Sequence, residues 1–83
     1  IYAERSEYAR ALEAGKAGIA IFIRLGKHQE TCRMYIGLGI INRYLKLYDA
    51  SIEANLLALN IAEQQRDTLL MGAIYGNLGN VYF

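Results

Sequence analysis

The chain has 83 residues, a formal net charge of +1, eight glycines, no proline and one histidine. This length allows one small domain and leaves little room for an enzyme, while the 54% hydrophobic content indicates a packed globular chain rather than a disordered one. Nine Lys and Arg balance eight Asp and Glu, so the chain has no excess of basic side chains to bind the phosphate backbone of a nucleic acid. This balance argues against a nucleic-acid partner. A single cysteine, Cys32, excludes an internal disulfide and a multi-cysteine zinc site.

Apolar residues recur at three- and four-residue intervals along the chain, which predicts an all-α fold of helices joined by short polar turns. The first segment, 1–5, is predicted as the end of a helix. A break follows at residues 5–7, where Ser6 is a candidate N-cap, and Asp67 is a second candidate cap. The remaining breaks leave four predicted helices, over the ranges 8–24, 29–45, 48–65 and 69–83.

The last predicted helix belongs to an uncharged run from Thr68 to Phe83. This run is 16 residues long and contains Asn77 and Asn80, whereas a membrane span needs about 20 apolar residues. We therefore expect no membrane span. The chain has no methionine at position 1 and ends inside this run, so we also expect a segment of a longer protein.

The chain repeats itself, since the range 1–43 aligns with the range 41–83, and the repeating unit is a pair of helices. Eight of the 43 pairs in this alignment are identical, and most lie at apolar or small positions of the predicted helices: Ile1/Ile41, Tyr8/Tyr48, Glu13/Glu53, Ala14/Ala54, Ile21/Ile61, Tyr35/Tyr75, Leu38/Leu78 and Gly39/Gly79. Small residues at such positions let the axes of neighbouring helices approach closely, as packed helical hairpins require.

The residues at these positions resemble the tetratricopeptide repeat family. The resemblance is carried by Leu38-Gly39, Tyr48, Ser51 and Ala58-Leu59, and one period earlier by Tyr8, Ala11-Leu12 and Gly18-Ile19. The usual period of this family is about 34 residues. The forty-residue period of this chain is longer and is similar to that of an extended subclass. Three residues depart from the family pattern: Asn42 and Asn55 replace aromatic or large apolar residues, and Lys46 replaces the usual glycine between helices.

The resemblance implies antiparallel helical hairpins stacked as a right-handed α-solenoid with a concave inner wall. In the family the first helix of each repeat lines that wall, which implies that 29–45 and 69–83 do so here. The residues that we expect to bind a peptide or protein partner on this wall are Arg33, Ile40, Arg43, Tyr44, Asn77 and Asn80. Asparagine amides pair with the backbone of an extended peptide, and arginines pair with carboxylates. For the asparagines and arginines the alternative is solvated surface or contacts with neighbouring repeats.

His28 and Cys32 lie four residues apart, a spacing that a catalytic base and nucleophile can have, and Glu30 adds a candidate metal ligand. No third group orients the histidine, no oxyanion donor is evident, and the spacing does not close a metal site. We expect no enzyme activity, no metal and no cofactor.

The function expected from the sequence is a non-enzymatic scaffold for protein–protein interaction. Two alternatives stay open: a regulatory or sensory segment of a larger, bacterial signalling protein, and a purely architectural spacer or oligomerisation module. Helix 69–83 has an uncovered apolar face, so self-association is expected there. Lone-cysteine usage and the lack of an N-glycosylation acceptor favour the cytoplasm, with a bacterial periplasm as the alternative.

Overall fold

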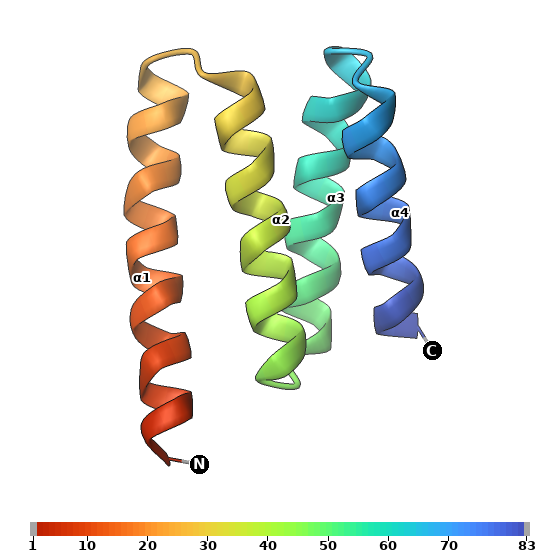
Figure 1. Ribbon diagram of the computed structural model, residues 1–83. Helices are drawn as coiled ribbons and strands as arrows, with labels where there is room; N and C mark the ends of the chain where they lie inside the picture. The colour runs from red at the N-terminus through yellow and green to blue at the C-terminus, as the bar shows by residue number, and fades with distance from the viewer. Residues whose placement is uncertain (1, 83) are drawn as a thin grey trace.

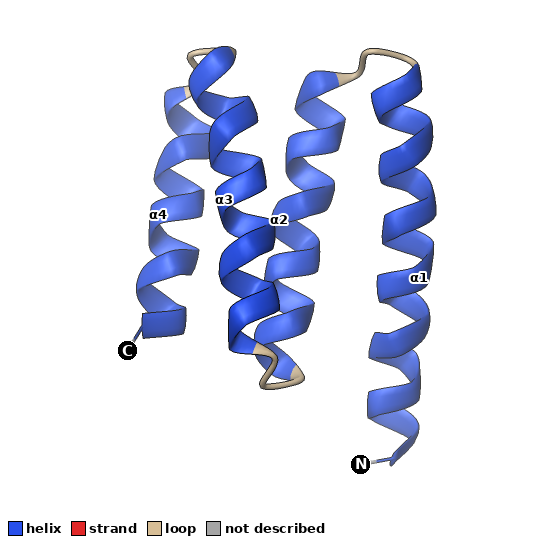
Figure 2. Cartoon of the chain, turned by 180° about the vertical axis from the view of Figure 1, so that it is seen from behind, coloured by secondary structure: helices blue, strands red, loops and turns tan. Residues whose placement is uncertain are grey.

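The computed structural model describes the backbone of residues 2–82 and the side chains of residues 5–82. Over these residues the fold is all-α, as predicted (Figure 2), with four helices: α1 (Tyr2–Arg24), α2 (His28–Tyr44), α3 (Tyr48–Gln64) and α4 (Thr68–Tyr82). The last three helices begin and end within one residue of the ranges expected from the sequence. Ile1 and Phe83, at the outer ends of the first and last predicted segments, lie outside the described residues.

The predicted break at residues 5–7 is wrong, because α1 is one helix of 23 residues that runs through it. The segment predicted as 1–5 is therefore no separate helix, and its described part is the start of α1. Ser6 lies among Glu, Arg and Ala, all good helix formers, and no glycine or proline is near. A serine inside such a helix costs only a few tenths of a kcal/mol relative to alanine, so the helix continues past it.

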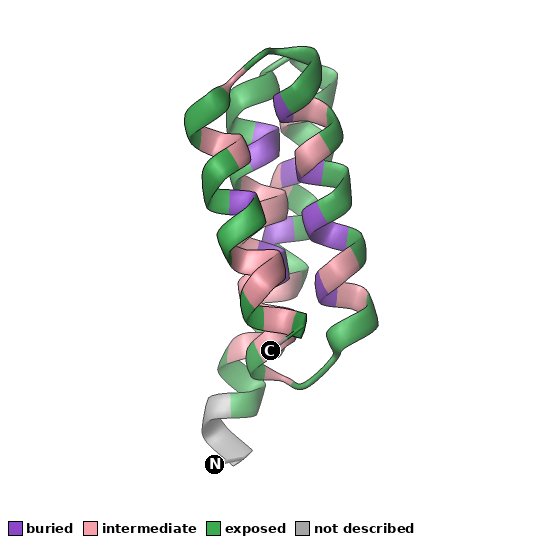
Figure 3. Ribbon diagram, turned by 90° about the vertical axis from the view of Figure 1, so that its right-hand side faces the viewer, coloured by how far each residue is buried: buried purple, intermediate pink, exposed green. Residues whose placement is uncertain are grey.

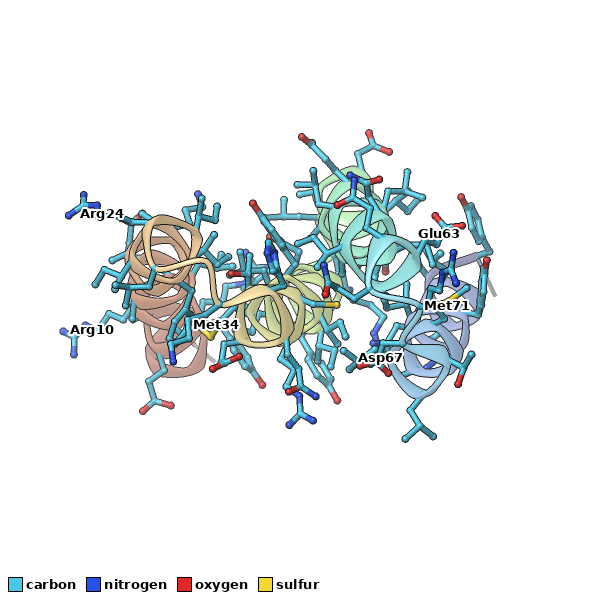
Figure 4. All side chains as sticks on the ribbon, turned by 90° about the horizontal axis from the view of Figure 1, so that it is seen from above. Arg10, Arg24, Met34, Glu63, Asp67 and Met71 are labelled. Atoms are coloured by element: carbon cyan, nitrogen blue, oxygen red, sulfur yellow. The ribbon has the colours of Figure 1, made fainter. Side chains whose placement is uncertain are left out.

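The chain reverses its direction at each turn, so that consecutive helices lie side by side (Figure 1). Among the described residues α1 contacts α2 alone, whereas α2 contacts both α3 and α4, and α3 also contacts α4. Looking down the helices, α3 lies to one side of the line that joins α2 and α4 (Figure 4). Because α1 and α3 do not touch each other, a space remains between them over α2.

The three turns share one backbone geometry, repeated at equal intervals along the chain. Each turn contains one residue in the left-handed region, with φ of 69° at Gly26, 63° at Lys46 and 55° at Arg66. The next residue donates its N–H to a carbonyl oxygen five positions earlier, as in Lys27 N to Phe22 O at 2.9 Å. This is the Schellman ending of a helix, which satisfies its last carbonyl groups. Lys46 thus occupies a position that suits glycine, as its departure from the family pattern predicts.

Replacing Lys46 by glycine is expected to raise the free energy of unfolding by up to about 1 kcal/mol, because glycine adopts positive φ without strain between its Cβ and the carbonyl. Gly26→Ala places a Cβ at the equivalent position and is expected to lower stability by a similar amount. Urea unfolding followed by circular dichroism measures both changes. Equal stability of all three proteins would contradict the prediction.

The N-terminus of α4 is capped by a side chain, as predicted from the sequence. The Asp67 Oδ1 atom accepts a hydrogen bond from the Leu70 backbone N–H at 3.1 Å. Such a cap satisfies one of the four N–H groups that a helix leaves without a partner inside the helix, and it fixes where α4 begins.

Two clusters of buried residues hold the helices together (Figure 3). The first joins α2, α3 and α4 through Cys32, Ala58, Ala62 and Ile74, which are at most 1% exposed. The second joins α1, α2 and α3 through Ile19, Leu38 and Ala54. Most of these residues are small, so the helices are held close together by short side chains.

A polar junction lies between α2 and α3, in the middle of this apolar packing. The Ser51 hydroxyl donates a hydrogen bond to the Gly39 carbonyl oxygen at 2.7 Å, and the Asn55 amide donates to the Ser51 carbonyl oxygen at 2.8 Å. Both side chains are fully buried. A Cβ at Gly39 would lie 2.6 Å from the Asn55 Nδ2 atom, so only glycine allows this approach of the two helices.

Candidate functional site

The predicted binding residues of α2 lie mostly on one side of that helix. Successive residues turn by about 100° in an α-helix, which places Arg33, Ile40 and Tyr44 within about 40° of one another. Cys32, fully buried, marks the side of α2 that faces the core. Arg33 is exposed, Ile40 is half-buried, and the Tyr44 side chain is 60% exposed.

Two of these residues already have partners within the protein. The Tyr44 ring stacks on Tyr8 of α1, with ring centroids 5.9 Å apart and planes 5° from parallel. The Arg43 guanidinium lies over the Tyr44 ring, 5.1 Å from its centroid, in a cation–π contact. The Tyr44–Tyr8 stack therefore helps to join α2 to α1, whereas Arg43 contacts a neighbour on its own helix.

The two predicted asparagines lie on α4. The forty-residue repeat aligns Asn77 with Gly37 and Asn80 with Ile40, so both belong to the side of α4 that matches the predicted side of α2. Asn77 is half-buried and Asn80 is exposed. We call the surface formed by Arg33, Ile40, Tyr44, Asn77 and Asn80 the α2–α4 face. Its two helices contact each other directly.

A hollow lies on the opposite side of α2, in the space between α1 and α3. Its volume is about 500 Å³, and most of its lining is apolar: Leu12, Ile19, Tyr35, Leu38, Leu47, Ala50, Ala54 and Leu57, with Lys16, Asn42 and Glu53 as the polar members. A second hollow of about 230 Å³ adjoins it toward the turn between α1 and α2, and the two share Tyr35 and Leu57. We call the two hollows together the α1–α3 groove.

The walls of the α1–α3 groove differ in charge, and its interior holds one amide. Lys16 comes from α1 and Glu53 from α3, so a cation and an anion stand on opposite walls. The Asn42 side chain is only 9% exposed, and no hydrogen bond to it is present among the described residues. Because the Asn42 amide lines the hollow, it can donate a hydrogen bond to a bound polar group and accept one from it.

Sequence reasoning missed this groove, although one signal for it was present. Asn42 departs from the repeat pattern that the sequence resembles, which usually has an aromatic residue at this position. A large ring there would fill part of the space that the smaller amide leaves open. The apolar lining residues resemble ordinary core positions, because no local pattern shows that α1 and α3 stay apart.

His28 and Cys32 do not form a reactive pair. The Cys32 thiol donates a hydrogen bond to the Ala58 carbonyl oxygen of α3 at 3.3 Å, and His28 is exposed. Burial raises the pKa of the Cys32 thiol above its ordinary value of 9.0; nearby Asp67 adds to the rise and Arg33 opposes it. A thiol in this state is a poor nucleophile, since the thiolate is the reactive form.

Native Cys32 is expected to react with disulfide reagents only as fast as the protein unfolds, because its side chain is fully buried and protonated. The raised pKa also makes stability pH-dependent. The unfolded chain loses the proton first as pH rises, so the contribution is full below the ordinary thiol pKa of 9.0 and is lost as pH rises further toward the folded pKa. Thiol labelling and urea unfolding at several pH values test this, and Cys32→Ala should lose the alkaline decline. Native labelling as fast as that of a short peptide would contradict the prediction.

No cluster of three or more His, Cys, Asp or Glu side chains that could hold a metal ion occurs in the part of the chain that the structure describes. None of the four helices, over the described residues, combines the length and the apolar character needed to cross a membrane.

Comparisons with models of known protein families, with curated proteins and with solved structures give no match for this chain.

Proposed function

We propose that the protein is a non-enzymatic interaction module, built from helical hairpins that stack as a short right-handed α-solenoid of the tetratricopeptide type. Two features support this architecture. The forty-residue repeat aligns α1 with α3 and α2 with α4, and the contacts follow it: α2 and α4 touch each other, whereas α1 and α3 do not. In such an array α2 and α4 line the inner wall, and α1 and α3 form the outer side.

The partner that fits best is a peptide or protein segment held in the α1–α3 groove. The observation that carries this proposal is the Asn42 amide, which lines an apolar hollow of about 500 Å³ and makes no hydrogen bond among the described residues. Apolar walls with one convergent polar group are the usual composition of a binding site. A segment with apolar side chains on one side would bury them against Leu57 and Tyr35, and one of its polar backbone groups would pair with Asn42.

The charges on the two walls of the groove favour one direction of the bound segment. An acidic side chain of the segment is favoured beside Lys16, and a basic one beside Glu53. A segment bound in the reverse direction across the groove would bring like charges together. We therefore expect the groove to prefer one direction of the bound chain.

The α2–α4 face is the second candidate for the same function. Asn77 and Asn80 lie one turn apart on α4, next to a helix that contacts it directly, and Asn80 is exposed to a partner. Arg33 is likewise exposed, so it is free to meet a carboxylate. This surface would take an extended peptide that pairs its backbone with the two amides.

A peptide library selected on the 83-residue chain distinguishes the two surfaces. Binders of the α1–α3 groove should lose at least about tenfold in affinity with Leu57→Glu, because a charge replaces an apolar wall. Leu56→Glu is the matched control, since Leu56 is similarly exposed but lines neither hollow of the groove. Binders of the α2–α4 face should instead respond to Asn77→Ala/Asn80→Ala.

The same peptide selection also tests the alternative functions. If no selected peptide responds to either set of variants, the peptide-binding proposal fails, and an architectural role as spacer or oligomerisation module takes its place. A regulatory segment of a larger signalling protein is compatible with either binding surface and requires a catalytic or receptor domain in the same parent chain. A cytoplasmic location is part of the proposal.

A further inference from the structure

The outer face of α4 is uncovered and partly aromatic. Tyr75 is 54% exposed and Tyr82 is 68% exposed. At Gly79, on the same face, an added Cβ would meet no atom within 4 Å. This face is separate from the α1–α3 groove, which α4 does not line.

The protein contains an equivalent face that is covered. The forty-residue repeat aligns Tyr75 with Tyr35 and Gly79 with Gly39, both identical pairs. Helix α3 packs on that equivalent face, where Asn55 fills the space that a Cβ of Gly39 would need. The α2–α3 contact therefore shows which kind of surface covers a face of this composition: a helix that presents small residues and packs closely.

The other end of the helix row offers the complementary half. A hollow of about 310 Å³ lies between α1 and α2, lined by Ala11, Ala14, Gly15, Arg33, Met34, Gly37, Leu38 and Ile41. Figure 4 shows Met34 between these two helices. One repeat period later in the sequence, the equivalents of this set include Ser51, Ala54, Asn55, Ile74 and Leu78, which belong to α3 and α4.

At that later position, beside α3 and α4, the space equivalent to this hollow is occupied by α2 itself. Ser51 and Asn55 meet Gly39 of α2, and Ile74 is fully buried in the cluster that contains Cys32 of α2. The pair α3 and α4 thus holds α2 in a place that, one repeat period earlier, the pair α1 and α2 leaves as a hollow. The helix that corresponds to α2 in the repeat, and has an uncovered face, is α4.

We propose that copies of this chain associate head to tail, with α4 of one copy seated in the hollow between α1 and α2 of the next. The contact continues the internal α2–α3–α4 packing across two molecules. It joins two different surfaces, so every assembly keeps one free α1–α2 hollow and one free α4 at its two ends, and the association does not close on itself. The partner is a second copy because one chain carries both halves of the contact.

Two variants block the two halves separately. Gly79→Glu places a side chain where α1 of the neighbour would pack, while in the single chain its Cβ has open space. Ala14→Glu places a charge in the hollow between α1 and α2, and Ala14 is exposed in the single chain. Ala73→Glu on α4 and Ala20→Glu on α1 are matched controls, because their equivalents Arg33 and Asn60 stay exposed even where neighbouring helices are in place.

Sedimentation velocity over a range of concentrations tests the proposal, with circular dichroism to show that every variant is helical. The unchanged chain and both controls should show a mass that rises with concentration. Gly79→Glu and Ala14→Glu alone should each stay at the 9.3 kDa of one chain. Mixed together they should form a species of twice that mass and nothing larger, since one intact seat meets one intact α4.

Three results would overturn the proposal: a monomeric unchanged chain at all concentrations, association that survives either blocking variant, or a mixture of the two variants that stays monomeric. Survival of association would indicate a symmetric contact through another surface. Because the proposal does not involve the α1–α3 groove, Leu57→Glu should leave the association unchanged.

Discussion

Ile74→Ala is expected to lower the free energy of unfolding by about 2–5 kcal/mol, the usual cost of emptying a buried aliphatic site. Ile74 is the largest side chain that is fully buried, and it lies in the cluster that joins α2, α3 and α4. Its neighbours Ala58 and Ala62 are too short to move into the space. A chain of this length has a total stability of only about 4–12 kcal/mol, so the change removes a large part of it.

The matched control lies on the same helix. Leu69 is 87% exposed, so Leu69→Ala should change stability by less than about 0.5 kcal/mol. Urea unfolding followed by circular dichroism measures both variants, at a low protein concentration so that association does not contribute. Similar losses for the two variants would show that α4 does not pack through Ile74.

Gly39→Ala is expected to destabilise the protein by about 1–3 kcal/mol, although alanine is the better helix former. The added Cβ would lie 2.6 Å from Asn55 Nδ2 and 3.1 Å from Asn55 Cγ. Asn55 is fully buried and its amide already donates to the Ser51 carbonyl oxygen, so it has no free space to occupy. Either the two helices separate or this hydrogen bond breaks.

Gly37→Ala tests the same change two residues away, where a Cβ would meet nothing within 4 Å. It should stabilise the protein by about 0.5–1 kcal/mol, because glycine loses more backbone entropy on folding. The double variant Gly39→Ala/Asn55→Ala should recover part of the loss, since it removes the colliding side chain and also the Asn55 Oδ1 atom, which is buried without a partner. A Gly39→Ala protein as stable as the unchanged chain would contradict the predicted collision.

Local sequence predicted the last three helices and the turns that precede them. Apolar residues at three- and four-residue spacing predict the three later helices to within one residue, and Asp67 caps α4 as its residue type suggests. Ser6 misled the prediction at the other end. Serine is common at helix starts, but its cost inside a helix of good formers is too small to end one.

The candidate sites depend on how helices meet, which a single sequence shows only in part. The resemblance to the tetratricopeptide repeat placed Tyr44 and Arg43 on a binding wall, whereas packing stacks Tyr44 on Tyr8 and sets Arg43 over the Tyr44 ring. In the sequence Asn42 is only an irregular position of the repeat, whereas in the structure it lines a hollow between α1 and α3.

The difference between what the sequence determines and what the tertiary structure determines has a physical basis. Helix formation and termination follow from backbone propensity, capping and the spacing of apolar residues, all of which operate within a few residues along the chain. The forty-residue repeat is likewise written in the sequence. The separation of α1 from α3, the close approach at Gly39 and the open seat between α1 and α2 depend on interhelix distances, which the sizes of side chains on different helices set jointly, so only the packed tertiary structure decides them.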